Sequence, residues 1–137
     1  MKKFVQAKEK IGATRINTWI ISSSGDLTYT ENMKQTTSRL KECAKVMKDH
    51  GVRLGLEYLG MRTLLTAARY SFISTLKECQ ELIATIGENN VGVILDTFHW
   101  YCAGESGDDI RSLKNEDISH IDLNDARLGF ERLTQQD

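Results

Sequence analysis

Apolar and polar positions alternate in blocks that predict strands and helices in turn along the chain. Blocks rich in β-branched and aliphatic residues predict strands over residues 15–21, 52–58, 91–96 and 118–123. Apolar positions at helical spacing predict helices over about 31–50 and 72–86, with shorter helical segments over 1–11 and 109–113. Strands that alternate with helices are typical of an α/β protein with a parallel sheet.

Alternation within the predicted strands assigns their side chains to two faces of the sheet. Leu54 and Leu56 should face the helices, whereas Gly55 and Glu57 should face the opposite side. Small and polar residues on that second side suit the inner face of a barrel whose mouth holds a ligand.

Length and composition restrict the class of protein. The chain has 137 residues, of which 40% are hydrophobic and 27% charged, and its net charge is −1. These values indicate one globular domain, residues 1–137, with no charge bias toward nucleic acid. Neither a membrane-spanning run nor a secretory signal pattern is seen. The cysteine count is odd and no CxxC pair exists, so we expect reduced thiols in a cytoplasmic protein.

Acidic residues stand at the ends of the three later predicted strands: Glu57, Asp96 and Asp122. Parallel strands share one direction, so these acids should meet at one rim of the sheet, where α/β proteins bind ligands. His99 and His120 fall at the same rim. Each acid alone would suit a simple helix cap, but the group together suits a divalent cation, either Mn²⁺, Mg²⁺, Co²⁺ or Zn²⁺.

Three segments, LGLEYLG, NVGVILDTFHWYCAG and ISHIDLNDARLG, together resemble the xylose isomerase-like TIM barrels, which include sugar-phosphate isomerases and epimerases and endonuclease IV. The resemblance implies metal ligation by Glu57 and Asp96. It implies that His99 contacts substrate, or a second metal in the multinuclear members of the family. Asp122 stands where the family usually has a ligand histidine, and we predict that it is the third metal ligand. His120 and Arg127 complete the predicted substrate-binding residues.

The resemblance places the predicted strands as the fourth to seventh of the eight strands of a TIM barrel. We therefore expect a partial (β/α) barrel of about four units, whose missing half comes from a second copy or from another part of a longer protein. Inner-face residues Ile94 and Ile118 should then be exposed to solvent.

The function that this reading implies is isomerisation or epimerisation of a small sugar or sugar phosphate through an enediolate. A dehydratase would use the same first step and then expel hydroxide, so the sequence does not separate these reactions. Glu57 would serve as the general base, and the missing barrel half would be needed for activity. Two alternatives remain open: a DNA-repair metalloprotein like endonuclease IV, which the near-neutral charge disfavours, and a non-catalytic interaction module.

Overall fold

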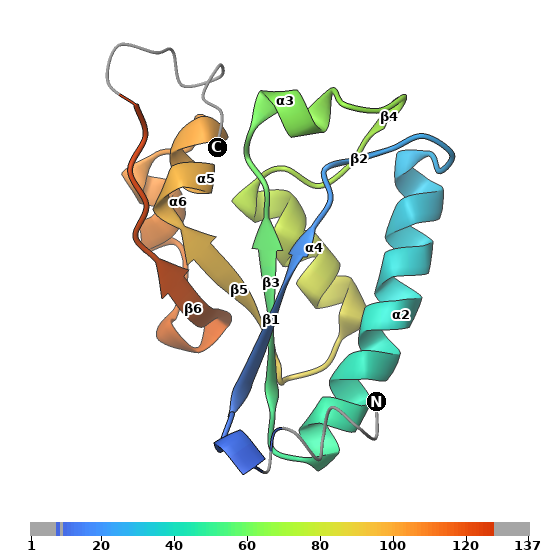
Figure 1. Cartoon of the computed structure of the whole chain (residues 1–137), viewed down its shortest axis with the longest axis vertical. Helices are drawn as coiled ribbons and strands as arrows, with labels where there is room; N and C mark the ends of the chain where they lie inside the picture. Colours follow the sequence, from blue (N-terminus) through green and yellow to red (C-terminus); the bar gives the residue numbers. More distant parts are fainter. Residues whose placement is uncertain (1–7, 9, 128–137) are drawn as a thin grey trace.

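A four-stranded parallel sheet forms the centre of the computed structural model, which describes residues 8 and 10–127 (Figure 1). Its strands lie in the order β1 (Arg15–Ile20), β3 (Arg53–Tyr58), β5 (Val91–Asp96) and β6 (Ile118–Asp122). Each neighbouring pair is parallel. The predicted α/β class and the four predicted strands are confirmed; the helix expected over 1–11 lies mostly outside the described residues.

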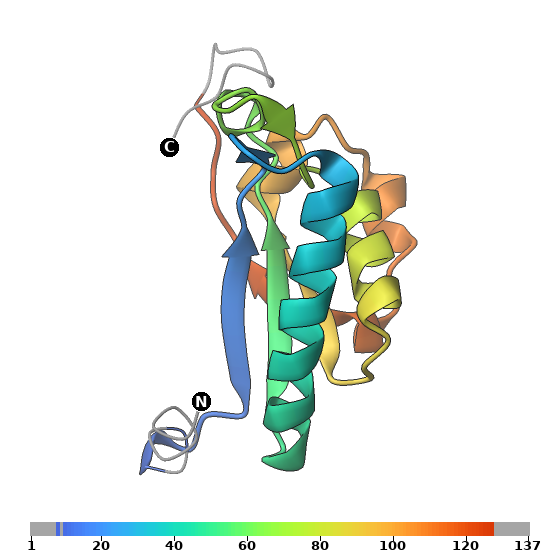
Figure 2. The ribbon, with the colours of Figure 1, turned by 90° about the vertical axis from the view of Figure 1, so that its right-hand side faces the viewer.

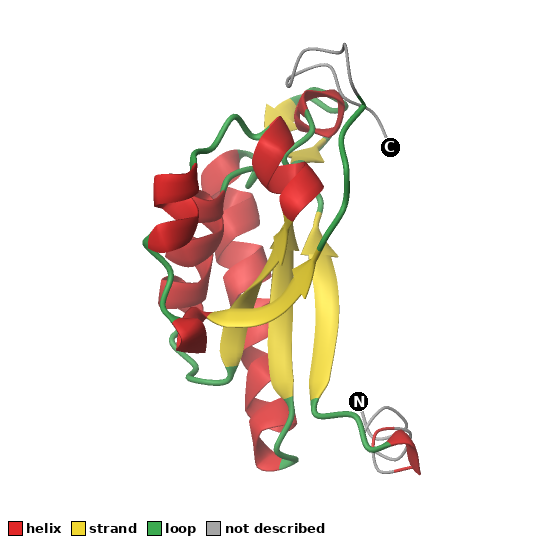
Figure 3. Cartoon of the chain, turned by 90° about the vertical axis from the view of Figure 1, so that its left-hand side faces the viewer, coloured by secondary structure: helices red, strands yellow, loops and turns green. Residues whose placement is uncertain are grey.

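Helices α2 (Tyr29–Asp49) and α4 (Leu76–Ile86) cover one face of the sheet, as Figures 2 and 3 show from two sides. Leu54, Leu56 and Tyr58 point from β3 into the core between sheet and helices, and Cys79 on α4 is fully buried there. Burial of each such large side chain contributes about 1.5–3 kcal/mol. None of the helices in the described part of the chain is long and apolar enough to cross a membrane.

Two helices begin at different residues from those predicted, because capping residues set their starts. Helix α2 begins at Tyr29, where Thr28 and Glu31 form a capping box. Helix α4 begins at Leu76, after the N-cap Thr75, rather than at Phe72. Phe72 is buried in the segment that follows a short antiparallel pairing of β2 (Ser23–Ser24) with β4 (Tyr70–Ser71), which the sequence did not indicate.

Shorter helical segments join the main elements, and one of them, over residues 107–111, corresponds to the short helix predicted over 109–113. These segments are α3 (Arg62–Leu65), α5 (Thr97–Cys102), α6 (Gly107–Arg111) and the 3-10 helix η1 (Asn115–Asp117). Helix α5 replaces the loop expected directly after the third predicted strand and begins at the strand's last residue, which is its N-cap.

The expectation that Ile94 and Ile118 are exposed on the inner face is wrong. Ile94 is only 2% exposed, and the inner face is crowded there, because Asn17, Ile94 and Ser119 all lie close to Gly55. A Cβ on Gly55 would lie 2.9 Å from Ile94 Cγ1 and 3.1 Å from Ser119 Oγ. A register shift between Val93 and Ile94 pairs Ile118 with Val93, so Ile118 packs on the helix side instead.

Candidate metal centre

The carboxyl ends of β3, β5 and β6 place the three predicted acids at one rim of the sheet. Glu57 is the penultimate residue of β3, and Asp96 and Asp122 are the last residues of their strands. Asp96 and Asp122 are register partners. The parallel sheet therefore brings the acids to one rim, as the sequence predicted.

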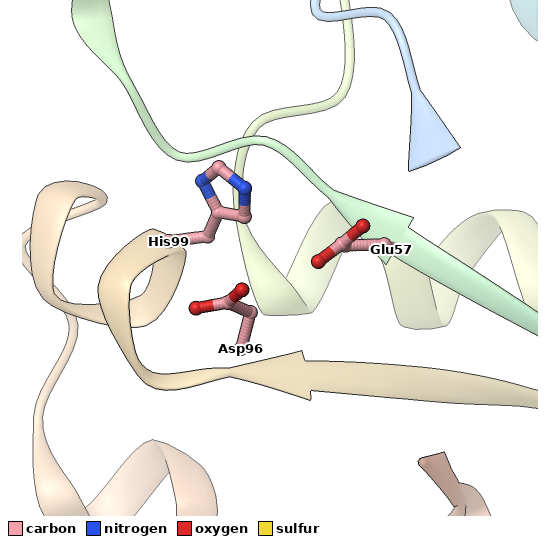
Figure 4. Close-up of side chains that lie close together, drawn as sticks. All are labelled: Glu57, Asp96 and His99. Atoms are coloured by element: carbon pink, nitrogen blue, oxygen red, sulfur yellow. The ribbon is translucent and has the colours of Figure 1, made fainter. Parts of the chain in front are cut away.

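Glu57, Asp96 and His99 form a compact cluster at this rim (Figure 4). Each offers one ligand atom, and these atoms all lie within 4.8 Å of one another. Asp96 is 6% exposed and His99 is 7% exposed, while Glu57 is half-buried. The three side chains come from β3, β5 and the first turn of α5, so the cluster depends on how these elements pack together.

Asp96 has two roles in this arrangement. Its Oδ1 accepts a hydrogen bond of 2.8 Å from the backbone N–H of Phe98, which makes Asp96 the N-cap of α5. Its Oδ2 accepts a hydrogen bond of 2.6 Å from Asn124 Nδ2. Helix capping and membership of the cluster, which the sequence presented as alternatives, are therefore compatible.

His99 reaches the cluster because α5 packs closely against the segment that follows β3. Gly60 in that segment lies against the backbone carbonyl of His99, so closely that a Cβ there would overlap its oxygen. The His99 ring also meets the Phe98 ring edge-on, with 5.5 Å between centroids. His99 was predicted to contact substrate; the structure places its ring among the candidate metal ligands.

The remaining predicted site residues do not join this cluster. Asp122 Oδ1 lies 3.1 Å from His120 Nε2, and both side chains are nearly half exposed. Arg127 is exposed, at the end of the described range. The structure thus brings together three of the predicted site residues and turns Asp122 toward His120; the metal role of Asp122 and the substrate roles of His120 and Arg127 stay predictions.

The donor set of the cluster fits a divalent cation. Two carboxylates and one imidazole are the ligands that Mn²⁺, Co²⁺ and Zn²⁺ accept, and carboxylates alone also suit Mg²⁺. Close carboxylates repel one another, and a cation between them removes that repulsion. Asp96 and His99 are both buried at a rim where α/β proteins bind ligands. These two side chains therefore suit a role in cation binding better than a role in packing alone.

The carboxylate of Glu105 holds the end of β3 in place through Tyr58, the residue after Glu57. Tyr58 donates a hydrogen bond of 2.7 Å to Glu105 Oε2, and the backbone N–H of Leu76 donates one of 2.6 Å to Glu105 Oε1. Burial raises the pKa of Glu105, and it also raises the pKa of Tyr58 well above its ordinary value. This contact could not be predicted from the sequence, because Glu105 lies 47 residues after Tyr58.

Trp19 was also missed. It is the register partner of Glu57 on the neighbouring strand, and it is 64% exposed. Register partners project to the same face of a parallel sheet, so Trp19 stands beside Glu57 on the inner face. Alternation along RINTWII could have assigned Trp19 to one face of the sheet, but only the pairing register places it next to Glu57.

Comparison with known proteins agrees with this architecture. A model of the xylose isomerase-like TIM barrel family matches residues 1–133. An inosose isomerase of Bacillus subtilis (strain 168) is 31% identical over 113 residues, which make up 78% of this chain and 36% of the relative.

Solved structures give the same result. A xylose isomerase domain protein from Alicyclobacillus acidocaldarius superimposes with a TM-score of 0.78 at 29% identity, over 87% of this chain and 42% of that protein. An IolI protein solved with a zinc atom gives a TM-score of 0.75 at 19% identity, over 91% of this chain and 42% of that protein. The chain thus spans about a third of the matched curated relative. Its parallel sheet and covering helices form a partial barrel, and the chain belongs to the xylose isomerase-like TIM barrel family.

Proposed function

We propose that the chain supplies the metal-binding part of an isomerase or epimerase site for a small sugar or sugar phosphate. The observation that carries this proposal is the cluster of Glu57, Asp96 and His99, whose ligand atoms lie within 4.8 Å of one another at the carboxyl rim of the sheet. The names of the matched relative, an inosose isomerase, and of the zinc-containing fold neighbour support it.

Each residue of the cluster has a chemical role in the proposal. Asp96 and Glu57 would hold the cation, which when bound polarises the oxygens of the substrate. Glu57 would also take the proton from the carbon beside the substrate carbonyl and return it to a carbon of the product. His99 would donate a hydrogen bond to a substrate oxygen and orient it. Asp122, which is the register partner of Asp96, is the proposed further ligand.

Metal binding by the full chain tests the proposal. Titration with Mn²⁺ should show one site, and Asp96→Asn should weaken it by at least about tenfold, because the variant keeps the shape of the side chain but removes its charge. Asp26→Asn, at a carboxylate in the loop before α2, is the matched control. Equal affinity in Asp96→Asn and the unchanged chain would contradict the proposal.

Activity is proposed to require completion of the barrel by a second copy of the chain. Among the described strands, β1 and β6 each pair with one neighbour only, and exposed apolar residues lie beside both: Ile21 is 64% and Ile121 is 49% exposed. Two copies related by a two-fold axis along the barrel would join β1 of each to β6 of the other.

Sedimentation equilibrium distinguishes a dimer, which could complete the barrel, from a monomer. A dimer should form and should be weakened about tenfold or more by Ile121→Lys, since a buried isoleucine contributes about 1.5–3 kcal/mol. A monomer that isomerises ketoses and aldoses at ordinary enzymatic rates would refute the need for completion. An inactive monomer would instead favour a missing barrel half that comes from another part of a longer protein.

A further inference from the structure

The segment after β6 is tied to the first residue of α5. Thr97 Oγ1 donates a hydrogen bond of 2.7 Å to the carbonyl oxygen of Asn124, and it accepts one of 2.8 Å from the backbone N–H of Asn124. The hydroxyl group of Thr97 therefore binds both the backbone carbonyl and the backbone N–H of Asn124. The tie runs across the same rim that carries the Glu57, Asp96 and His99 cluster.

The side chain of Asn124 uses this fixed position to contact Asp96. Its Nδ2 donates a hydrogen bond of 2.6 Å to Asp96 Oδ2, while the N–H of Phe98 donates one of 2.8 Å to Oδ1. Each carboxylate oxygen thus has one of these donors, and the plane of the carboxylate is set by two bonds from different elements. A carboxylate accepts about four hydrogen bonds or metal bonds, so each oxygen keeps room for a ligand in the cluster.

We propose that Asn124 is a positioning residue for the metal centre, acting through Asp96, and that Thr97 acts one step further out by placing Asn124. The inference rests on the proposed function of the cluster as a metal centre. Without the amide of Asn124, Asp96 would keep only the second of these two hydrogen bonds, from the N–H of Phe98. Its carboxylate group would then be freer to rotate. Groups that orient metal ligands in this way typically contribute about 10–100-fold to metal affinity.

Mn²⁺ titration of the full chain, together with thermal melting of the metal-free chain, tests this inference. Asn124→Ala should lower Mn²⁺ affinity by about 10–100-fold. Its melting temperature should change little, because Asn124 is exposed. Asn89→Ala is the matched control: Asn89 is exposed too, but it lies just before β5, at the far end of the sheet, and should leave affinity unchanged.

Thr97 offers a second, independent pair of variants. Thr97→Ser keeps the hydroxyl group that holds Asn124 and should keep Mn²⁺ affinity, whereas Thr97→Val keeps the shape but removes both hydrogen bonds and should lower it. This pair decides the question if Asn124→Ala proves too unstable to assay. Equal affinity in the serine and valine variants would overturn the role of Thr97.

The outcomes separate this inference from the proposed function. If the unchanged chain binds Mn²⁺ and Asn124→Ala binds it equally well, the positioning role is wrong and the metal centre stands. If the unchanged chain binds no Mn²⁺, the metal centre fails and the positioning role fails with it. Lower affinity in Asn124→Ala and Thr97→Val, with unchanged melting and normal affinity in Asn89→Ala and Thr97→Ser, supports the inference.

Discussion

The Gly60→Ala variant tests the close contact between Gly60 and the backbone of α5, which places His99 in the cluster. A Cβ at Gly60 would overlap the carbonyl oxygen of His99 and lie 2.9 Å from the backbone nitrogen of Ala103. Both neighbours belong to the backbone of α5 or its C-cap, so no flexible side chain can move aside. Gly60 does not have positive φ. The glycine is therefore required by close approach and not by its backbone dihedral angle.

The size of the effect follows from this geometry. Overpacking of a tightly packed region typically costs about 1–3 kcal/mol, and a clash with backbone belongs at the upper end. Loss of about 3 kcal/mol in the free energy of unfolding should lower the melting temperature by about 10 °C in a chain of this length. Because α5 must shift to relieve the overlap, His99 should move away from Glu57. The shift should also disturb Asp96, which is the N-cap of α5 and a proposed metal ligand, so Mn²⁺ affinity should fall as well.

Gly25→Ala is the matched control for the loss of a glycine. A Cβ at Gly25 meets nothing within 4 Å, and this glycine has no positive φ either. The substitution should leave stability unchanged or raise it by about 0.4–1 kcal/mol through the unfolded chain. Urea unfolding and thermal melting of both variants make the comparison. If Gly60→Ala were as stable as Gly25→Ala, the close packing of α5 on this segment, and with it the position of His99, would be wrong.

Three further predictions address the site and its support. His99→Gln should reduce turnover of the active assembly by about 10²-fold with little change in melting temperature, and a large loss of stability with normal turnover would show that His99 only packs. Thr75→Ala removes the side chain that accepts from Glu78 N and should lower the free energy of unfolding by about 1 kcal/mol in urea titrations; an unchanged midpoint would contradict the cap. Burial raises the pKa of Glu105, so its contribution to stability is present below its ordinary pKa and is lost as pH rises through the raised value. Glu105→Gln should therefore remove part of the fall in stability that occurs as pH rises above the ordinary pKa of a glutamate, and identical pH profiles for the two proteins would argue against the shift.

Much of the architecture could be predicted from local pattern. Alternation and β-branched composition placed the four strands of the parallel sheet, and their shared direction put Glu57, Asp96 and Asp122 at one rim. These features depend on residues close together in the chain, which is why the sequence carries them. The starts of α2 and α4 were not predicted, although Thr28 with Glu31 and Thr75 with Glu78 form capping boxes at ordinary sequence spacing.

Packing decided which rim residues come together. His99 enters the cluster because Gly60 lets α5 approach the segment after β3, and Asp122 faces His120 instead of joining the cluster. The pairing register decided that Trp19 stands beside Glu57 and that Ile118 faces the helices.

The contacts of Asn124 with Asp96 and of Glu105 with Tyr58 join residues 28 and 47 positions apart. Sequence by itself determined the elements and the chemistry at their ends, because both follow from local propensity and strand direction. Only the tertiary structure decided which of those groups share a site, because distances between segments far apart in the chain depend on register and packing.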